Sequence, residues 1–368
     1  MLDILSLLRL AKERGASDLH LVANSPPLLR INGALEPMVD VTPLTPGDLN
    51  QIFCQIAPKK GRDDFNSRLE LDFSYELPDV ARFRCNAARQ RGTLSIAIRL
   101  LPLTVPSLEE LGLPEVCREL VLKQRGLVVV SGPTGSGKST TLAAMIDYLN
   151  KTESRRVITI EDPIEFVYSN NKCTITQREL GSDTLSFAEA LKHVLRQDPD
   201  VIMVGEMRDL ETATAVLTTA ETGHLVITTG HAPSASQAIE RIVDLFPLHE
   251  RHLAQSRLAS LLLGVLCQAL IPRADGAGRI AAIEIMLGNP AVKNLIREGK
   301  IHQLPNIIRT HARIGMTLLD ECLVKLYRQE LISRENLLAF CNDRGEVARA
   351  IGMVEQNSLD STIAVDTP

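Results

Sequence analysis

A glycine-rich loop ending in lysine and serine separates a short apolar stretch from an amphipathic one, and this junction constrains the fold more than any other feature. Residues 127–130 are apolar and mostly β-branched, and residues 142–149 carry leucine and isoleucine at helical spacing. The loop satisfies the pattern GxxxxGK[ST]. It comprises Gly132, Pro133, Thr134, Gly135, Ser136, Gly137, Lys138, Ser139 and, one residue further, Thr140. The junction therefore predicts a buried strand, a phosphate-binding loop and a helix.

The residue types of this loop fit a nucleoside triphosphate. Glycines allow backbone N–H groups to curl around phosphates at a helix N-terminus. Lys138 would neutralise charge on the outer phosphates, and the Ser139 hydroxyl would ligate Mg²⁺. We therefore expect ATP and Mg²⁺ at this loop.

The rest of the second half of the chain predicts an α/β domain. Residues 157–160, 201–204 and 225–229 are short apolar runs separated by helical stretches, which is typical of parallel strands with helical crossovers. Beyond residue 256 the pattern is mostly helical, and a polar tail covers residues 355–368. The predicted domain spans residues 115–354.

The first hundred residues predict a smaller α+β domain. A leucine-rich amphipathic helix ends at Gly15, and Thr45 with Pro46 opens a second helix. Alternating runs predict antiparallel strands at residues 18–22, 28–31, 34–38, 69–75 and 82–100. Three prolines between residues 101 and 114 indicate a linker to the second domain.

Composition argues against binding of nucleic acid. The net charge is -5 and aromatic residues make up 3%, so phosphate contacts and stacking platforms are both poorly supplied. The seven cysteines form no CxxC pair, which favours a reducing compartment. We expect a cytoplasmic protein.

Hydrolysis would need a carboxylate that polarises water. The run at residues 201–204 is followed by Gly205 and Glu206. Gly205 stands where a metal-binding aspartate is usual, so Glu206 is the predicted water-polarising residue. The alternatives are a surface glutamate without a role, or a scaffold that binds nucleotide without hydrolysing it.

Acidic and histidine residues follow or flank other predicted strands. Glu161, Asp162 and Glu165 come after residues 157–160, and strand ends of this kind meet at the ligand-binding edge of a parallel sheet. His224 and His231 bracket residues 225–229, and we expect both near the nucleotide. By itself an acidic turn is more often solvated structure, and only its location beside the phosphate loop favours a functional role. The spacing of the two histidines is equally compatible with a structural and a functional role.

Arginines concentrate on the last predicted strands of the first domain, at positions 82, 84, 89, 91 and 99. They are compatible with a solvated strand face. The functional alternative is that they complete the ATP site of a neighbouring subunit, as arginine fingers do.

The motifs together resemble the secretion ATPase superfamily, and within it the type IV pilus retraction ATPases. The resemblance includes GPTGSGKST from Gly132, EDPIEF from Glu161, VIMVGEMRD from Val201 and TGHLVITTGHA from Thr222. It extends to GASDLHL, RFRCNA and NPAVKNLIREGKIHQL, which start at Gly15, Arg82 and Asn289. The last segment resembles a signature that separates retraction ATPases from assembly ATPases.

The resemblance implies a RecA-like ATPase core, a PAS-like first domain and a helical C-terminal region. It also implies a homohexamer with ATP at each subunit seam, where Arg84 and Arg99 act on the neighbouring subunit. The implied partners are an inner-membrane pilus platform protein and a retraction ATPase paralogue, with the ring peripheral at that membrane. Gly230 and Ala232 depart from the usual family residues around His231, and AVKNLIRE keeps the signature's pattern without every residue.

Three alternatives share parts of this pattern. An accessory retraction paralogue and an assembly or type II secretion ATPase would carry the same hydrolytic motifs. A nucleic-acid translocase would share the core, but the composition disfavours it.

Overall fold

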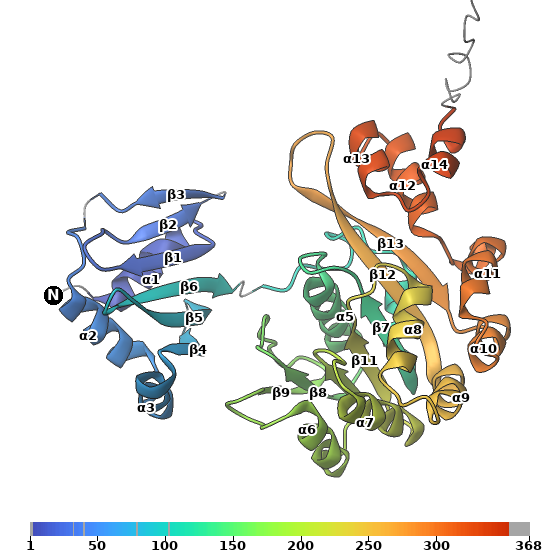
Figure 1. Cartoon of the computed structure of the whole chain (residues 1–368), viewed down its shortest axis with the longest axis horizontal. Coiled ribbons are helices and arrows are strands. Elements are labelled where there is room, and N and C mark those ends of the chain that lie inside the picture. The colour runs from blue at the N-terminus through green and yellow to red at the C-terminus, as the bar shows by residue number, and fades with distance from the viewer. Residues whose placement is uncertain (1–2, 32, 40, 79, 102–103, 353–368) are drawn as a thin grey trace, which may run out of the picture. The chain divides into compact units, whose positions relative to one another are not determined.

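The computed structural model describes residues 3–31, 33–39, 41–78, 80–101 and 104–352. Within these ranges the chain divides into two compact units, each described here by itself (Figure 1). The first is Met1–Val105 with Pro163–Tyr168, and the second is Pro106–Asp162 with Ser169–Pro368. Residues 106–114 of the predicted linker thus group with the second unit, and the tail predicted for residues 355–368 lies outside the described residues.

The first unit contains a 6-stranded antiparallel sheet with the order β3-β2-β1-β6-β5-β4. Its strands are β1 (Asp18–Val22), β2 (Leu28–Ile31), β3 (Ala34–Pro37), β4 (Glu70–Leu77), β5 (Ala81–Gln90) and β6 (Thr93–Leu101). The helices are α1 (Ile4–Glu13), α2 (Pro46–Ile56) and α3 (Lys59–Arg68). Alternate residues of the strands, such as Leu19 and Leu21 or Phe83 and Cys85, are buried with the apolar faces of the helices. The opposite face of the sheet is therefore polar.

Local sequence signals explain the ends of several of these elements. Thr45 and Asp48 form a reciprocal capping box at the start of α2, with Pro46 in the first turn, as predicted. The run predicted as one strand at residues 82–100 is instead the hairpin β5–β6. Arg91 and Gly92 have φ of 48° and 77°, the two positive values that a tight hairpin turn requires.

The second unit is built on a 7-stranded sheet with the order β13-β12-β7-β11-β10-β8-β9 (Figure 1). Every neighbouring pair is parallel except β12 and β13. The strands are β7 (Gly126–Ser131), β8 (Arg156–Glu161), β9 (Thr174–Glu179), β10 (Val201–Val204), β11 (Leu225–Thr229), β12 (Leu262–Pro272) and β13 (Arg279–Leu287). The parallel strands predicted at β7, β8, β10 and β11 are present.

Helices connect and flank these strands. They are α4 (Val116–Val121), α5 (Lys138–Thr152), α6 (Phe187–Val194), α7 (Leu210–Glu221), α8 (Ala235–Asp244) and α9 (Arg251–Leu261). One continuous core joins Val129, Ile160, Val204 and Val226 of the sheet to buried residues of α6, α7, α8 and α9. The buried residues of α5 lie outside this cluster, so α5 is placed on the other face of the sheet.

The prediction of a mostly helical chain beyond residue 256 was wrong for β12 and β13. Residues 258–271 form a nearly continuous apolar run, and such a run is compatible with a buried helix or a buried strand. Helices resume after the hairpin as α10 (Pro290–Arg297), α11 (Leu304–Thr310), α12 (Leu319–Arg328), α13 (Arg334–Phe340) and α14 (Arg344–Ala350). Among the described residues, none of the helices has the length and apolar character needed to cross a bilayer.

Candidate active site

The phosphate loop connects the end of β7 to the start of α5, as predicted. Gly132, Gly135 and Gly137 have φ of 142°, 78° and 87°, a region that favours glycine. A Cβ at Gly132 would lie 2.3 Å from the carbonyl O of Gln268 on β12. Only glycine lets the loop pass this close to the neighbouring strand.

Two polar side chains of the loop fit an anionic ligand. Lys138 Nζ donates hydrogen bonds to the carbonyl O atoms of Gly132 (2.8 Å) and Pro133 (2.9 Å), which places the ammonium group over the loop. Ser136 Oγ is buried and has no hydrogen-bond partner among the described residues. Because an unpaired buried hydroxyl costs roughly 1–3 kcal/mol, its presence here fits a site where a ligand oxygen completes the hydrogen bond.

A second contact fixes the loop to β12. Thr141 Oγ1 in the first turn of α5 donates to Gln268 Oε1 at 2.7 Å, and both side chains are buried. A Cβ at Gly137 would also lie 2.9 Å from Gln268 Nε2. Gln268 therefore shapes the loop from the side of β12.

A cavity of about 530 Å³ adjoins the start of α5 at Gly137 and Thr140. Its apolar lining comes from three separate segments and includes Leu111, Leu113, Leu270 and Ile280. Charged residues, among them Glu110 and Arg279, also line it. A cavity of this size with both apolar and polar lining, next to a phosphate loop, suits the base and sugar of a nucleotide.

Glu206 is the most enclosed carboxylate at the end of β10, with 8% of its surface exposed. Its Oε2 lies 3.1 Å from Nε2 of His231, and its Oε1 lies 2.6 Å from Nη2 of Arg208. Both oxygens of the predicted water-polarising residue are thus held by nitrogen donors, one of which the sequence analysis did not single out.

The backbone on either side of His231 is fixed to the end of β7. The Gly230 N–H donates to the Val130 carbonyl at 3.0 Å. Ser131 Oγ donates to the Ala232 carbonyl at 2.7 Å. Because Gly132 follows Ser131 directly, the Glu206–His231 pair lies beside the start of the phosphate loop.

The glycine that replaces the usual aspartate has a packing reason. The Gly205 N–H donates to the Ile160 carbonyl at 2.8 Å, so β8 and the end of β10 lie close together. A Cβ at Gly205 would lie 3.3 Å from that carbonyl O and 3.5 Å from Glu161 Cα. An aspartate would be crowded there, while Glu161 brings a carboxylate to the adjacent strand end.

The acidic cluster divides between the two units. Glu161 is buried at the end of β8, where its Oε1 accepts hydrogen bonds from Thr159 Oγ1 (2.6 Å) and Gln177 Nε2 (3.1 Å). Ile158 and Ile160 face the core under α6 and α7, so Glu161 points to the face that carries α5 and the phosphate loop. Asp162 follows it and is exposed. Glu165 belongs to the segment Pro163–Tyr168 of the first unit.

The expectation that both histidines lie near the nucleotide was wrong for His224. All strands around β11 are parallel, and His224 precedes β11 whereas His231 follows it. At about 3.3 Å per residue the two are roughly 20 Å apart. His224 Nδ1 instead lies 2.9 Å from Thr222 Oγ1 and 3.2 Å from the Thr219 carbonyl O, at the C-terminal end of α7.

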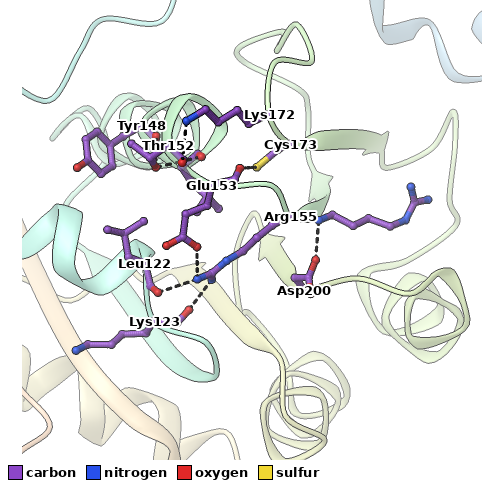
Figure 2. Close-up of polar contacts among 11 residues, drawn as sticks. Leu122, Lys123, Tyr148, Thr152, Glu153, Arg155, Lys172, Cys173 and Asp200 are labelled. Carbon is purple, nitrogen blue, oxygen red and sulfur yellow. Dashed lines mark hydrogen bonds and ion pairs between the residues drawn. The ribbon is translucent and has the colours of Figure 1, made fainter.

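The amino edge of the same sheet has its own polar cluster around the buried Arg155 (Figure 2). Arg155, 8% exposed, donates to the carbonyl O atoms of Lys123 (2.7 Å) and Leu122 (2.8 Å) and forms an ion pair with Glu153 at 2.5 Å. Asp200 Oδ2 accepts from the backbone N–H of Arg156 at 2.7 Å. These contacts tie the ends of α4 and α5 to the start of β8.

In the first unit, Arg84 and Arg99 are directly opposite each other in the β5–β6 register. Both are exposed. Arg99 Nε donates to Asp18 Oδ1 at 2.8 Å, while Arg84 projects from the same polar face of the sheet. The two predicted arginines are therefore adjacent.

Sequence reasoning missed Gln268 and Arg208. Gln268 is a polar residue inside an apolar run, and this exception to the pattern was the available signal. Arg208 lies two residues after Glu206, but nothing in its spacing indicates an ion pair with that residue. Leu111 and Leu113 had been assigned to the linker.

Comparisons with known proteins identify the family. The family model described as "Type II/IV secretion system protein" matches residues 5–340. The chain is 50% identical over 335 residues to the Pseudomonas aeruginosa "Type IV pilus retractation ATPase PilT", covering 91% of this chain and 97% of that protein. It is 41% identical to the "Type IV pilus ATPase PilU" of the same organism, covering 96% and 92%.

A solved structure gives the same result. The crystal structure of the pilus retraction motor PilT with bound ADP aligns with a TM-score of 0.89 and 44% identity, covering 95% of this chain and all of that one. The fold predicted from the motifs, an ATPase core with a smaller N-terminal domain and a helical C-terminal region, is confirmed. The chain belongs to the family of type II/IV secretion system proteins.

Proposed function

We propose that this chain is the subunit of a homohexameric motor that hydrolyses ATP to retract type IV pili. The observation that carries the proposal is the Glu206–His231 pair beside the phosphate loop. This pair supports the proposal because an enclosed carboxylate lies beside the loop expected to bind the phosphates of a nucleoside triphosphate. Hydrolysis of ATP bound at the loop needs such a carboxylate to orient the attacking water.

The residues have distinct roles in this proposal. The loop from Gly132 to Thr140 holds the phosphates, and Lys138 neutralises their charge. Glu206 orients and polarises the attacking water, while His231 holds one oxygen of Glu206. Mg²⁺, when bound through Ser139, would spread the negative charge of the phosphates. Glu161 and Asp162 support this edge from the neighbouring strand, and the 530 Å³ cavity takes the base and sugar.

A ring gives the first unit a catalytic purpose. Its sequence has no phosphate loop, yet Arg84 and Arg99 present two guanidinium groups side by side. Burial would raise the pKa of Asp18, but hydrogen bonds from Arg99 and Ser17 outweigh burial and hold this pKa below its ordinary value. Asp18 thus remains ionised and orients Arg99 beside Arg84. We propose that both act on ATP bound by the neighbouring subunit, with Glu165 as a further polar contributor.

The direction of work is proposed from the relatives and from one helix. The name of the relative with 50% identity specifies retraction. Residues 289–304, which resemble the retraction signature, include α10 (Pro290–Arg297). This helix is capped by Asn289, whose Oδ1 accepts from the Val292 N–H at 2.8 Å. Val292 and Ile296 are buried in the core. We propose an inner-membrane platform protein as the partner, a cytoplasmic ring peripheral at that membrane, and no nucleic-acid substrate.

Complementation between inactive subunits tests the shared site. Arg84→Ala and Lys138→Ala chains should each have little ATPase activity. Mixed rings should regain activity at roughly a quarter of the seams, where an intact loop meets an intact Arg84. If the chain were a monomer in solution, by its measured mass, and had full ATPase activity, the proposed ring would be contradicted.

Deletion of the gene tests direction. Retraction predicts surplus surface pili and loss of twitching, whereas an assembly motor predicts loss of pili. The 41% identity to PilU makes an accessory retraction ATPase the second candidate. That candidate predicts surplus pili only when a second retraction ATPase is also deleted.

A further inference from the structure

Arg208 pairs directly with Glu206, and the proposed function gives it no role. Its Nη2 lies 2.6 Å from Glu206 Oε1, while His231 Nε2 lies 3.1 Å from Oε2. The carboxylate is therefore held on both sides. A carboxylate that polarises water must accept a hydrogen bond from that water, and a guanidinium on its oxygen makes it a weaker acceptor.

The two partners of Glu206 differ in how easily they can leave. His231 is fixed by backbone contacts of its neighbours to Val130 and Ser131 at the end of β7. The Arg208 side chain is 67% exposed, against 10% for that of Glu206. Solvent around the exposed Arg208 screens its attraction to Glu206 and lets the side chain adopt other conformations. Arg208 is thus the partner that can move at small cost.

Arg208 lines a cavity of about 320 Å³, so its guanidinium has open space beside it. Its polar lining comes from Arg208, Arg241, His231, Ser131 and Thr229, and no carboxylate of the described residues lines it. Ser131 is the residue directly before the phosphate loop. The cavity therefore reaches the residue before the loop, and its two arginines give it a charge that attracts an anion.

We propose that Arg208 senses the terminal phosphate of ATP by exchanging partners. Without that phosphate Arg208 binds Glu206 and restrains it. With ATP bound, the guanidinium moves to the terminal phosphate and leaves Glu206 held by His231 alone, free to accept a hydrogen bond from water. The proposal rests on the proposed function of Glu206 and assigns the residue that couples ATP binding to its release.

Exchange makes a thermodynamic prediction that a fixed ion pair does not. Because the Arg208–Glu206 pair must break when ATP binds, the free energy of the pair makes the free energy of ATP binding less favourable. Removing the charge of Glu206 should then strengthen ATP binding only when Arg208 is present. ADP lacks the terminal phosphate and should be indifferent to both residues.

The experiment is a double-mutant cycle on nucleotide affinity in the full chain. Dissociation constants for a nonhydrolysable ATP analogue with an imido-linked terminal phosphate, and for ADP, are measured with Mg²⁺ by calorimetry. The four proteins are the parent, Arg208→Ala, Glu206→Gln and the double variant. Arg208→Ala should weaken binding of the analogue by about tenfold and leave ADP within about twofold. Glu206→Gln should strengthen analogue binding about threefold in the parent and not in the Arg208→Ala background.

Two further variants separate sensing from a structural role. Arg208→Lys keeps the charge and should restore part of the preference for the analogue over ADP. Arg257→Ala removes a different guanidinium, which pairs with both oxygens of Glu221 at 2.7 and 2.8 Å, and should leave that preference unchanged.

The outcomes are distinct. Additive effects of the two substitutions, or an equal loss of analogue and ADP binding in Arg208→Ala, would overturn the exchange while leaving the proposed function intact. A parent chain that bound neither nucleotide would overturn the proposed function, and the exchange with it.

Discussion

The two edges of the 7-stranded sheet are both rich in polar side chains, but they use them differently. At the amino edge, Arg155 donates to two backbone carbonyls and pairs with Glu153. At the carboxyl edge, Ser136 Oγ has no partner among the described residues, and Glu206 is held by an exposed arginine. The amino edge thus has its hydrogen bonds made within the chain, while the carboxyl edge retains unsatisfied or exchangeable groups.

This difference separates structural polar clusters from functional ones. Burial alone does not distinguish them, because Arg155 and Glu206 are equally enclosed at 8% exposure. What distinguishes them is whether every donor and acceptor has a fixed partner. Substitutions at the amino edge should therefore reduce stability, and those at the carboxyl edge should reduce turnover.

The largest effect is expected from Lys138→Ala. Its ammonium lies over the loop, and its loss should lower ATP turnover on the order of 10³-fold because charge on the phosphates is no longer neutralised. Lys172→Ala is the control, since Lys172 Nζ donates only to the Thr152 carbonyl at the amino edge, at 3.1 Å. A steady-state ATPase assay of both variants checks this, and equal losses would remove the distinction between the edges.

Arg155→Ala should have the largest effect on stability. It leaves two carbonyls without their donor and Glu153 without its partner, and should lower the free energy of unfolding by about 2–4 kcal/mol. Urea denaturation measures this change. Lys300→Ala, which removes an exposed pair with Glu298 at 2.8 Å, should cost less than about 1 kcal/mol. If Arg155→Ala unfolded at the parent's urea midpoint, the amino-edge cluster would not have the structural role assigned to it.

The smallest effect should separate the two histidines at the ends of β11. His231→Ala removes the partner of Glu206 Oε2 and should lower kcat about tenfold. His224→Ala lies at the other edge and should leave kcat within about twofold. A comparable loss of kcat in both variants would show that distance from the phosphate loop does not decide which histidine matters.

Much of the fold could be predicted because local signals and the tertiary structure agree. The capping box of Thr45 and the glycines of the phosphate loop each require one local conformation. The hairpin β12–β13 could not be predicted, because its residues are buried and lack a polar period that distinguishes strand from helix. The turn at Arg91–Gly92 was missed although the polar run at residues 89–93 interrupts the alternation there.

The sequence predicted the site residues that are close to one another in sequence or that follow a recognisable strand, and missed those brought together only by tertiary packing. The loop residues are contiguous, and Glu206 follows closely after a predicted strand. The error at His224 came from treating both ends of β11 as equivalent, although strand direction separates them. Gln268 and Arg208 were missed because their contacts arise from tertiary packing, Gln268 with Thr141 across 127 positions of sequence.

Matched glutamate substitutions at the two edges test the central claim most directly. Glu206→Gln and Glu153→Gln make the same chemical change, one beside the phosphate loop and one beside Arg155. Turnover of ATP and affinity for ADP are measured for both in the full chain. We predict that Glu206→Gln keeps ADP affinity and loses turnover on the order of 10²–10³-fold, while Glu153→Gln keeps both. Full turnover by Glu206→Gln would contradict the assignment of hydrolysis to this residue.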